Sequence, residues 1–172
     1  MNFHELIRTR CSVRAYQERP VDGGRLDQIL EMANRAPSAG NLQAYSILII
    51  RHPQTKAALL QAALHQNALV QAPVVLVFIA RPDVSAAKYS QRGASLYAIQ
   101  DATIACAYAQ LAAVELGLAS VWIGAFEEET VSRILKVTGE DRPVALLPIG
   151  YPAESPEPTP RRSLADLARE AA

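Results

Sequence analysis

The segment 95–116 is the feature that most constrains how this chain can fold. Its spacing predicts one long helix that ends at Gly117. Apolar or small residues lie around nearly all of its circumference: Ile99, Ala102, Thr103, Ala105, Cys106, Ala109, Leu111, Ala112, Ala113, Val114 and Leu116. A helix that is apolar on nearly every side has to be buried on nearly every side. Because one layer of neighbours in a small domain rarely covers such a helix, we expect its second face to be a subunit interface.

The composition is that of one folding unit that tends to associate. The chain has 172 residues, enough to bury about 70% of its unfolded surface without disulfides or metals. Hydrophobic residues make up 50% of the chain and charged residues only 20%, which favours association. The formal net charge of zero argues against nucleic acid or an anionic membrane surface as a partner. A small or apolar ligand is the better expectation.

Several common functional signatures are missing from the sequence. The three histidines stand far apart without the spacing of a zinc site, so we expect no metal. There is no glycine fingerprint of a dinucleotide fold, no P-loop and no nucleophile elbow. Two cysteines without a CxxC pair, and no signal-like opening segment, favour a reducing cytoplasm. The longest apolar segments, 68–80 and 102–126, are interrupted by polar residues, so we expect neither to span a membrane.

The remaining elements are expected to be helices and strands in mixed order. The patterns predict four further helices: one at 3–7, one that Asp22 caps and that ends before Pro37, one from 53 towards 66, and one opened by the glutamates at 127–129. They predict strands at 45–50, 73–80, 119–123 and 144–149, of which 73–80 is of the buried type. The segment 10–16 is expected to be extended, and 83–93 to be a mobile loop. Four prolines between 152 and 160 predict an extended arm over about 152–172. We expect a single domain over residues 1–172.

Arg10, Ser12 and Arg14 are the first residues that suggest a ligand. In an extended chain, alternate side chains point to the same side, so two guanidiniums and a hydroxyl can meet on one anion. A phosphate monoester fits such a fork. A solvated strand edge without a ligand is the alternative interpretation. Cys11 and Val13 would point the other way, into the core.

Two further segments can approach a planar ligand. The loop 37–43 combines a proline, a glycine, and the amide side chains of Asn41 and Gln43, each of which offers a donor and an acceptor. The same residue types are common in loops without a ligand. The segment 117–126 reaches Gly124, where backbone N–H groups can come close to a ligand. Trp122 in that segment can equally be a core aromatic residue.

Together these segments resemble the FMN-dependent nitroreductase family, in the same order along almost the whole chain. Residues 10–16, RCSVRAY, resemble the family motif RRSxRxF, which holds the FMN phosphate and reaches the flavin ring. Residues 36–43, APSAGNLQ, match the APSxxNxQ loop. Residues 111–124 are similar to the LAAxxLGLGxxWIG segment. Residues 161–164 resemble the end of the closing KxRRPL motif, whose arginine returns to the phosphate.

The resemblance implies an α+β fold in which helices surround a mainly antiparallel sheet, and an intertwined homodimer with two FMN sites along its interface. It assigns cofactor contacts to Arg10, Cys11, Ser12, Arg14, Pro37, Ser38, Ala39, Asn41, Gln43, Gly124, Ala125 and Arg161. The arginines and Ser12 would contact the phosphate or ribityl chain, and Arg14 would also face the N1/O2 edge of the flavin. Residues 37–41 would approach the ring from the partner subunit. Gly124 and Ala125 would offer backbone contacts near N5, and Gln43 is a weaker candidate.

Three positions depart from the family pattern. Cys11 replaces the second arginine of the first motif, and Thr159 stands where a lysine is frequent. The phosphate site therefore has fewer cations and depends more on Arg161. Tyr45 stands where tryptophan is common, which changes the wall beside the flavin. The family's mid-chain contacts have no clear match, although two residues lie in roughly the right region, Gln66 and Asn67.

The resemblance implies an enzyme that moves a hydride from NADH or NADPH through flavin N5 to a second substrate by a ping-pong mechanism. The acceptors would be nitroaromatics, quinones or similar conjugated molecules. Because the chemistry resides in the cofactor, we expect no side chain to act as nucleophile or general base. Three alternatives stay open: a specialised member such as a dehalogenase or a flavin-fragmenting enzyme, a non-enzymatic FMN carrier dimer, and a dimer that binds an apolar ligand without flavin.

Overall fold

A four-stranded sheet forms the centre of the protein. The computed structural model describes residues 1–171. Its strands are β1 (Tyr45–Ile50), β2 (Val74–Ala80), β3 (Ala119–Ser120) and β4 (Arg142–Gly150), in the spatial order β1-β2-β4-β3. Every neighbouring pair of strands is antiparallel. The predicted combination of helices with a mainly antiparallel sheet is therefore confirmed.

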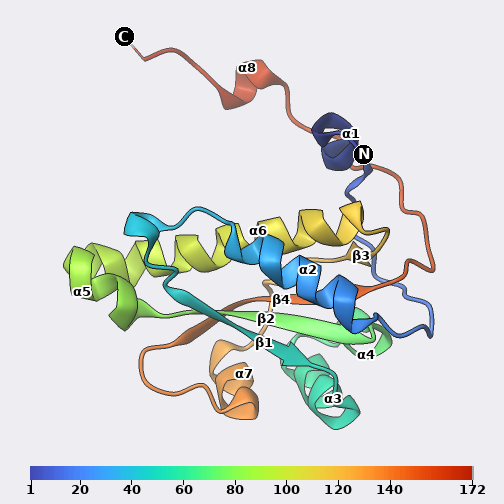
Figure 1. Cartoon of the computed structure of the whole chain (residues 1–172), viewed down its shortest axis with the longest axis horizontal. Coiled ribbons are helices and arrows are strands. Elements are labelled where there is room, and N and C mark those ends of the chain that lie inside the picture. Colours follow the sequence, from blue (N-terminus) through green and yellow to red (C-terminus); the bar gives the residue numbers. More distant parts are fainter. Residues whose placement is uncertain (172) are drawn as a thin grey trace.

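Helices cover both faces of this sheet (Figure 1). The helices α2 (Gly23–Asn34) and α6 (Ala98–Glu115) lie on one face, and α3 (Pro53–Ala62) and α7 (Glu128–Leu135) lie on the other. All residues of β2 are buried. Because side chains alternate along a strand, its even-numbered residues from Val74 on pack with α2 and α6, and its odd-numbered residues pack with α3. This double burial explains why β2 has an apolar run instead of an alternating pattern.

Capping side chains fix the start of the first two helices. Asn2 and Glu5 form a capping box at α1 (Phe3–Thr9), in which Asn2 Oδ1 accepts from Glu5 N at 3.0 Å and Glu5 Oε2 accepts from Asn2 N at 2.9 Å. At α2, Asp22 Oδ1 accepts from Arg25 N at 2.9 Å, so the predicted cap is confirmed.

The inner face of α6 is packed tightly against its neighbours. Small residues bring it close to α2 and the sheet within one core: Ala105, Cys106, Ala109, Ala112 and Ala113. The outward face is covered less completely, because Tyr108 is exposed and Ile104 and Leu111 are only partly buried. This outward face is the one expected to meet a second subunit.

The expectation of a mobile loop at 83–93 is wrong. This segment belongs to α5 (Pro82–Arg92), which a π-helical turn, η2 (Gly93–Tyr97), joins to α6. Pro82 stands in the first turn, where its missing N–H breaks no helical hydrogen bond. The polar residues that suggested a loop form the exposed side of the helix, whose buried residues are Pro82 and Ser85. As a result, α6 begins at Ala98, later than predicted.

Two extended segments form less regular sheet than predicted. The predicted strand at 119–123 is continuous only over β3, and Ile123 then pairs with β4 as an isolated bridge. The segment 10–16 is joined to the sheet at two separate points, where Ser12 pairs with Ser120 of β3 and Tyr16 pairs with Pro152. The segment therefore lies along the end of the sheet, beside the start of the C-terminal arm.

The C-terminal arm and α1 project from the layered body (Figure 1). Residues 153–163 form no helix or strand, but α8 (Leu164–Leu167) interrupts the arm that was expected to be extended. Leu164 of α8 is 81% exposed and Phe3 of α1 is 67% exposed. Both ends of the chain thus present apolar side chains that the body does not cover. No helix within residues 1–171 is long and apolar enough to cross a membrane.

Candidate functional site

The two ends of the chain meet in a cleft of about 860 Å³. One side is formed by α1 and the extended segment that follows it, and the other side by the arm. The lining residues are Ile7, Arg8, Arg10, Cys11, Ser12, Arg14, Pro156, Glu157, Pro158, Thr159 and Arg161. The structure thus brings Arg10, Cys11, Ser12, Arg14 and Arg161 of the predicted site together.

Backbone pairing and one buried tyrosine hold the first of these segments in place. Val13 N donates to Ser120 O at 3.1 Å. Tyr16 Oη donates to Val13 O at 2.7 Å and to Pro148 O at 3.3 Å. Burial raises the pKa of Tyr16, so the phenol stays protonated and remains a donor. Gly150 makes room for the ring, because a Cβ there would lie 2.9 Å from Tyr16 Cδ1.

The side chains of this segment follow the predicted alternation with one exception. Val13 is buried, while Ser12 and Arg14 line the cleft. Cys11 was expected to face the core, but it is only partly buried and touches both the core and the cleft. The chain leaves α1 at Arg10, which is already extended, so Cys11 lies at the turn between the two elements.

The cleft is strongly cationic. Arg8, Arg10, Arg14 and Arg161 line it, together with the single carboxylate of Glu157. Among residues 1–171, none of these four guanidiniums has a carboxylate oxygen within 4.0 Å. Guanidiniums gathered in a concave site without carboxylate partners suit an anion, and a phosphate in particular.

Arg8 is a cleft residue that the sequence analysis missed. It lies in the last turn of α1, a helix for which the sequence analysis considered only the apolar side. The available signal was its position two residues before Arg10, the first residue of the motif. Arg8 thus adds a guanidinium to the cleft, where Cys11 stands in place of the family's second arginine.

Hydrogen bonds fix the arm beside the segment that it faces. Glu154 Oε1 accepts from the backbone N of Arg14 at 2.5 Å and of Ala15 at 3.2 Å. Farther along the arm, Arg161 Nη1 donates to the backbone oxygen of Thr159 at 3.0 Å and to its hydroxyl at 2.9 Å. Thr159 therefore orients the guanidinium that is predicted to reach the phosphate.

The predicted ring-facing loop adopts a strained backbone. It contains the short helix η1 (Ala39–Asn41), and positive φ angles occur at Gly40 (58°), Asn41 (57°) and Gln43 (45°). Non-glycine residues in such conformations cost about 1–3 kcal/mol each, and the surrounding structure has to hold them. Gln43 Nε2 donates to Asn41 O and, at 2.9 Å, to Asn41 Oδ1, so the two amides support each other.

Asp101 of α6 anchors this loop, and the sequence analysis missed it. Its side chain is almost fully buried, with 2% of the residue exposed. Its Oδ1 accepts from Ala39 N at 2.9 Å and its Oδ2 accepts from Ala44 N at 3.3 Å, so one carboxylate holds both ends of the strained stretch. The signal was a carboxylate in the first turn of a helix that is otherwise apolar on nearly every side.

The loop lies at one end of α6, and α1 and the arm, whose residues line the cationic cleft, lie at the other end (Figure 1). Asp101, which holds the loop, is in the first turn of α6. Glu115 ends the helix and pairs with the N-terminus of the chain at 3.7 Å, beside α1. The helix has 18 residues and therefore spans about 27 Å at 1.5 Å per residue. Within one chain, the structure does not bring Pro37, Ser38, Ala39, Asn41 or Gln43 to the cleft.

Gly124 and Ala125 lie outside the lining of this cleft as well. They follow Ile123, whose bridge to Leu146 holds this stretch along β4. Gln66 Nε2 donates to Ala125 O at 3.1 Å, so one of the two mid-chain candidates does touch the predicted site segment. Asn67 is the residue before α4 (Ala68–Gln71) and caps it with its backbone oxygen.

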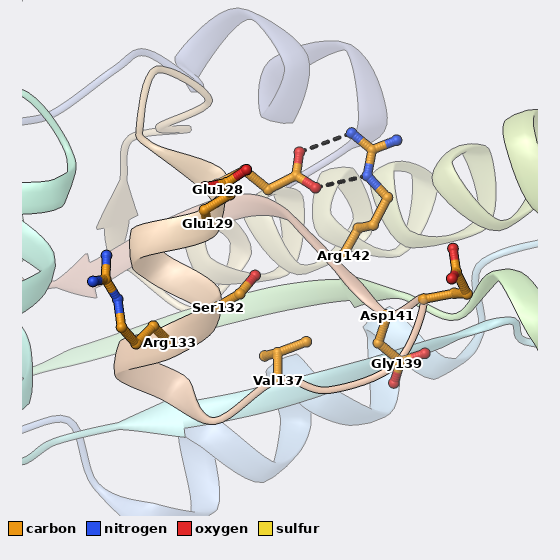
Figure 2. A pocket seen from close by; sticks show the side chains of 9 residues that line it. Glu128, Glu129, Ser132, Arg133, Val137, Gly139, Asp141 and Arg142 are labelled. Carbon is orange, nitrogen blue, oxygen red and sulfur yellow. Dashed lines mark hydrogen bonds and ion pairs between the residues drawn. The ribbon is translucent and has the colours of Figure 1, made fainter.

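A second cleft, of about 520 Å³, lies between α7 and the start of β4 (Figure 2). Arg142 Nε and Nη2 donate to the two carboxylate oxygens of Glu128, both at 2.8 Å. This hydrogen bonding lowers the pKa of Glu128. The pair ties α7 to β4, and the residues predicted for the site all lie elsewhere.

Comparison with known proteins identifies the family. The model of the Nitroreductase family matches residues 7–70 and 61–151. The chain belongs to the nitroreductase family. A protein of Thermus thermophilus named NADH dehydrogenase is 35% identical, over 90% of this chain and 89% of its own length. The FMN reductase (NAD(P)H) of Bacillus subtilis is 31% identical, over 87% of this chain and 66% of its own length.

Solved structures agree with this family membership. The structure of B. megaterium NfrA2 superposes with a TM-score of 0.91 at 28% sequence identity, covering 100% of this chain and 75% of that one. The nitroreductase-like fold that the sequence motifs imply is therefore confirmed.

The anchoring role of Asp101 gives a first prediction. Asp101→Ala removes a buried acceptor from two backbone N–H groups, and a hydrogen bond to a charged group contributes about 1.5–3 kcal/mol. We expect the free energy of unfolding in urea to fall by about that amount, and amide exchange at Ala39 and Ala44 to accelerate. Asp27→Ala, at an exposed position inside α2, is the control and should not lower the free energy of unfolding, because alanine is the better helix former. Unchanged stability and exchange in the Asp101 variant would contradict the role.

Proposed function

We propose that this protein is an FMN-dependent oxidoreductase that passes a hydride from NAD(P)H to a small conjugated acceptor such as a nitroaromatic or a quinone. The observation that carries this proposal is the meeting of Arg10, Ser12, Arg14 and Arg161 in one cationic cleft, from opposite ends of the chain. Chance would rarely unite two motifs that the family uses for one phosphate. A relative that is 31% identical is named FMN reductase (NAD(P)H), which supports the same cofactor and donor.

The residues of the cleft fit the phosphate end of FMN. Guanidiniums without carboxylate partners would hold the phosphate by charge-assisted hydrogen bonds. Arg14 would also face the N1/O2 edge of the ring, where a cation stabilises the reduced cofactor.

The chemistry of the proposed reaction belongs to the cofactor. When held by Arg10, Ser12, Arg14 and Arg161, FMN would supply hydride transfer between the nicotinamide and the acceptor in a ping-pong sequence. The chain itself would bind and orient the partners. Gly124 and Ala125, both exposed, would present backbone groups near N5. No side chain is assigned as nucleophile or general base.

A complete site would require two copies of the chain. The loop 37–43 and the cationic cleft lie at opposite ends of α6, a helix about 27 Å long. A twofold axis across the outward face of α6 would place the loop of one copy beside the cleft of the other. The incompletely covered face around Tyr108 and the exposed apolar residues of α8 are consistent with such an intertwined homodimer.

One observation favours the alternative of a non-enzymatic FMN carrier: Cys11 and Thr159 leave the predicted phosphate site with fewer cations than the family pattern has. Arg8 adds a cation to the cleft and weakens this argument.

A flavin spectrum followed by a donor test separates the candidates. The purified protein should be yellow, and anaerobic mixing with NADH or NADPH should bleach the flavin within seconds. No bleaching with either donor would favour the carrier, and colourless protein that takes up no FMN would favour an apolar-ligand dimer.

Removing Arg14 should weaken the binding of FMN. Loss of a charge-assisted hydrogen bond costs about 1.5–3 kcal/mol, so Arg14→Ala should raise the Kd for FMN by about 10- to 150-fold, measured by fluorescence quenching of added FMN. Arg133→Ala, in the cleft between α7 and β4, is the matched control and should leave the Kd unchanged. An Arg14→Ala variant with wild-type FMN affinity would remove this residue from the site.

The shared site predicts complementation between two inactive variants. Arg14→Ala and Asn41→Ala should each impair both sites of a homodimer. In a mixed dimer, one site receives both changes and the other receives neither, so about half of the FMN binding and reductase activity should return. We would isolate the mixed dimer with two affinity tags. Absence of recovery would contradict a site in which one chain supplies Arg14 and the other supplies Asn41.

A further inference from the structure

A cluster of two cations and two tyrosines lies beside the loop 37–43. Lys88, Tyr89 and Arg92 come from α5, and Tyr97 comes from η2. The two tyrosine rings meet edge to face, with centroids 5.2 Å apart. Lys88 Nζ lies 5.4 Å from the centre of the Tyr89 ring, and Arg92 Nε donates to Tyr97 Oη at 3.0 Å. We call these four residues the cation–tyrosine cluster.

The cation–tyrosine cluster is in direct contact with the loop. A Cβ built on Gly40 would lie 2.5 Å from Tyr89 Oη and 2.8 Å from Lys88 Nζ, so these two side chains lie directly against Gly40 and would have to move for any other residue. Gly40 also has the positive φ angle that glycine adopts without cost. Asn41 and Gln43, which are proposed to approach the flavin ring of the other subunit, lie within three residues of Gly40, the residue that the cluster contacts.

Backbone strain on both sides of this contact suggests that its geometry serves a ligand. Ser90, between the two halves of the cluster, has a φ of 50° and a ψ of −142°, which interrupts α5. Asn41 and Gln43 on the facing loop also have positive φ angles. Strained non-glycine residues tend to gather at binding sites, where the protein holds them for function.

The charges of the cluster are not used within the chain. Lys88 and Arg92 are exposed, and neither has a carboxylate oxygen within 4.0 Å among residues 1–171. Each instead lies near the face of a tyrosine ring. A ligand that combines a planar ring with an anionic group would satisfy both parts, since the rings offer apolar contact and the cations offer charge-assisted hydrogen bonds.

We infer that the cation–tyrosine cluster selects substrates that combine a planar ring with an anionic group. The inference rests on the proposed function, because it places the cluster at the entrance to the flavin. The anion has two chemical sources, a carboxylate or sulfonate on the ring of the acceptor and the additional phosphate on the adenosine ribose of NADPH. In both cases Lys88 and Arg92 bind the charge, while Tyr89 and Tyr97 lie against a planar ring of the same ligand, either the acceptor ring or the adenine.

The test compares charged and uncharged ligands on the FMN-loaded dimer. Calorimetry measures the affinity for naphthalene-2-sulfonate, which undergoes no reduction, and for neutral 2-naphthol. The double variant Lys88→Gln/Arg92→Gln should weaken sulfonate binding by about three- to tenfold for the charges removed, and by at least three times more than it weakens 2-naphthol binding. The charge-preserving variant Lys88→Arg/Arg92→Lys should regain most of the affinity, and Arg133→Gln is the control in the distant cleft.

Steady-state kinetics then distinguish the two sources of the anion. If the acceptor supplies it, the double variant should raise the KM for 1,4-naphthoquinone-2-sulfonate more than that for 1,4-naphthoquinone. If the donor supplies it, the KM for NADPH should rise more than that for NADH. Equal losses of affinity for the charged and the neutral naphthalene would overturn the inference. Because calorimetry needs no turnover, this binding result is independent of flavin bleaching, which decides the proposed function.

Discussion

The burial of α6 is the constraint on which the rest of the structure depends. A helix with apolar or small residues around most of its circumference cannot lie on a surface without a large cost in exposed apolar area. Its alanines allow α2 and the sheet to pack closely against one side. The helix thereby fixes the distance between its two ends, and the functional segments of the chain are attached at those ends.

This attachment divides the site. Asp101, in the first turn of α6, holds the strained loop 37–43 by both of its carboxylate oxygens. Glu115, at the last residue, pairs with the N-terminus next to the cationic cleft. A rigid helix cannot shorten, so the loop 37–43 and the segments that line the cationic cleft stay apart within one chain. The proposed homodimer would bridge that separation, and the helix whose sequence demands burial would also supply the face for it.

Electrostatics distinguish the cleft at the chain ends from the cleft between α7 and β4. The arginines of the cleft at the chain ends lie without carboxylate partners, which leaves their charges available to an anion. In the cleft between α7 and β4, Glu128 and Arg142 satisfy each other through two hydrogen bonds. A neutralised pair links two elements, whereas an unneutralised group of cations attracts a ligand. The same reasoning applies to Lys88 and Arg92 beside the loop.

The sequence by itself determined most of the helices, the central strands and the family. Periodicity and caps are local properties, so the apolar run of β2 and the cap at Asp22 could be predicted from neighbouring residues alone. Only the tertiary structure decided which side chains meet. It showed that α5 is a helix whose polarity comes from an exposed side, that Arg8 joins the cleft, and that Asp101 anchors the loop. These facts depend on contacts between residues distant in sequence, which no local pattern records.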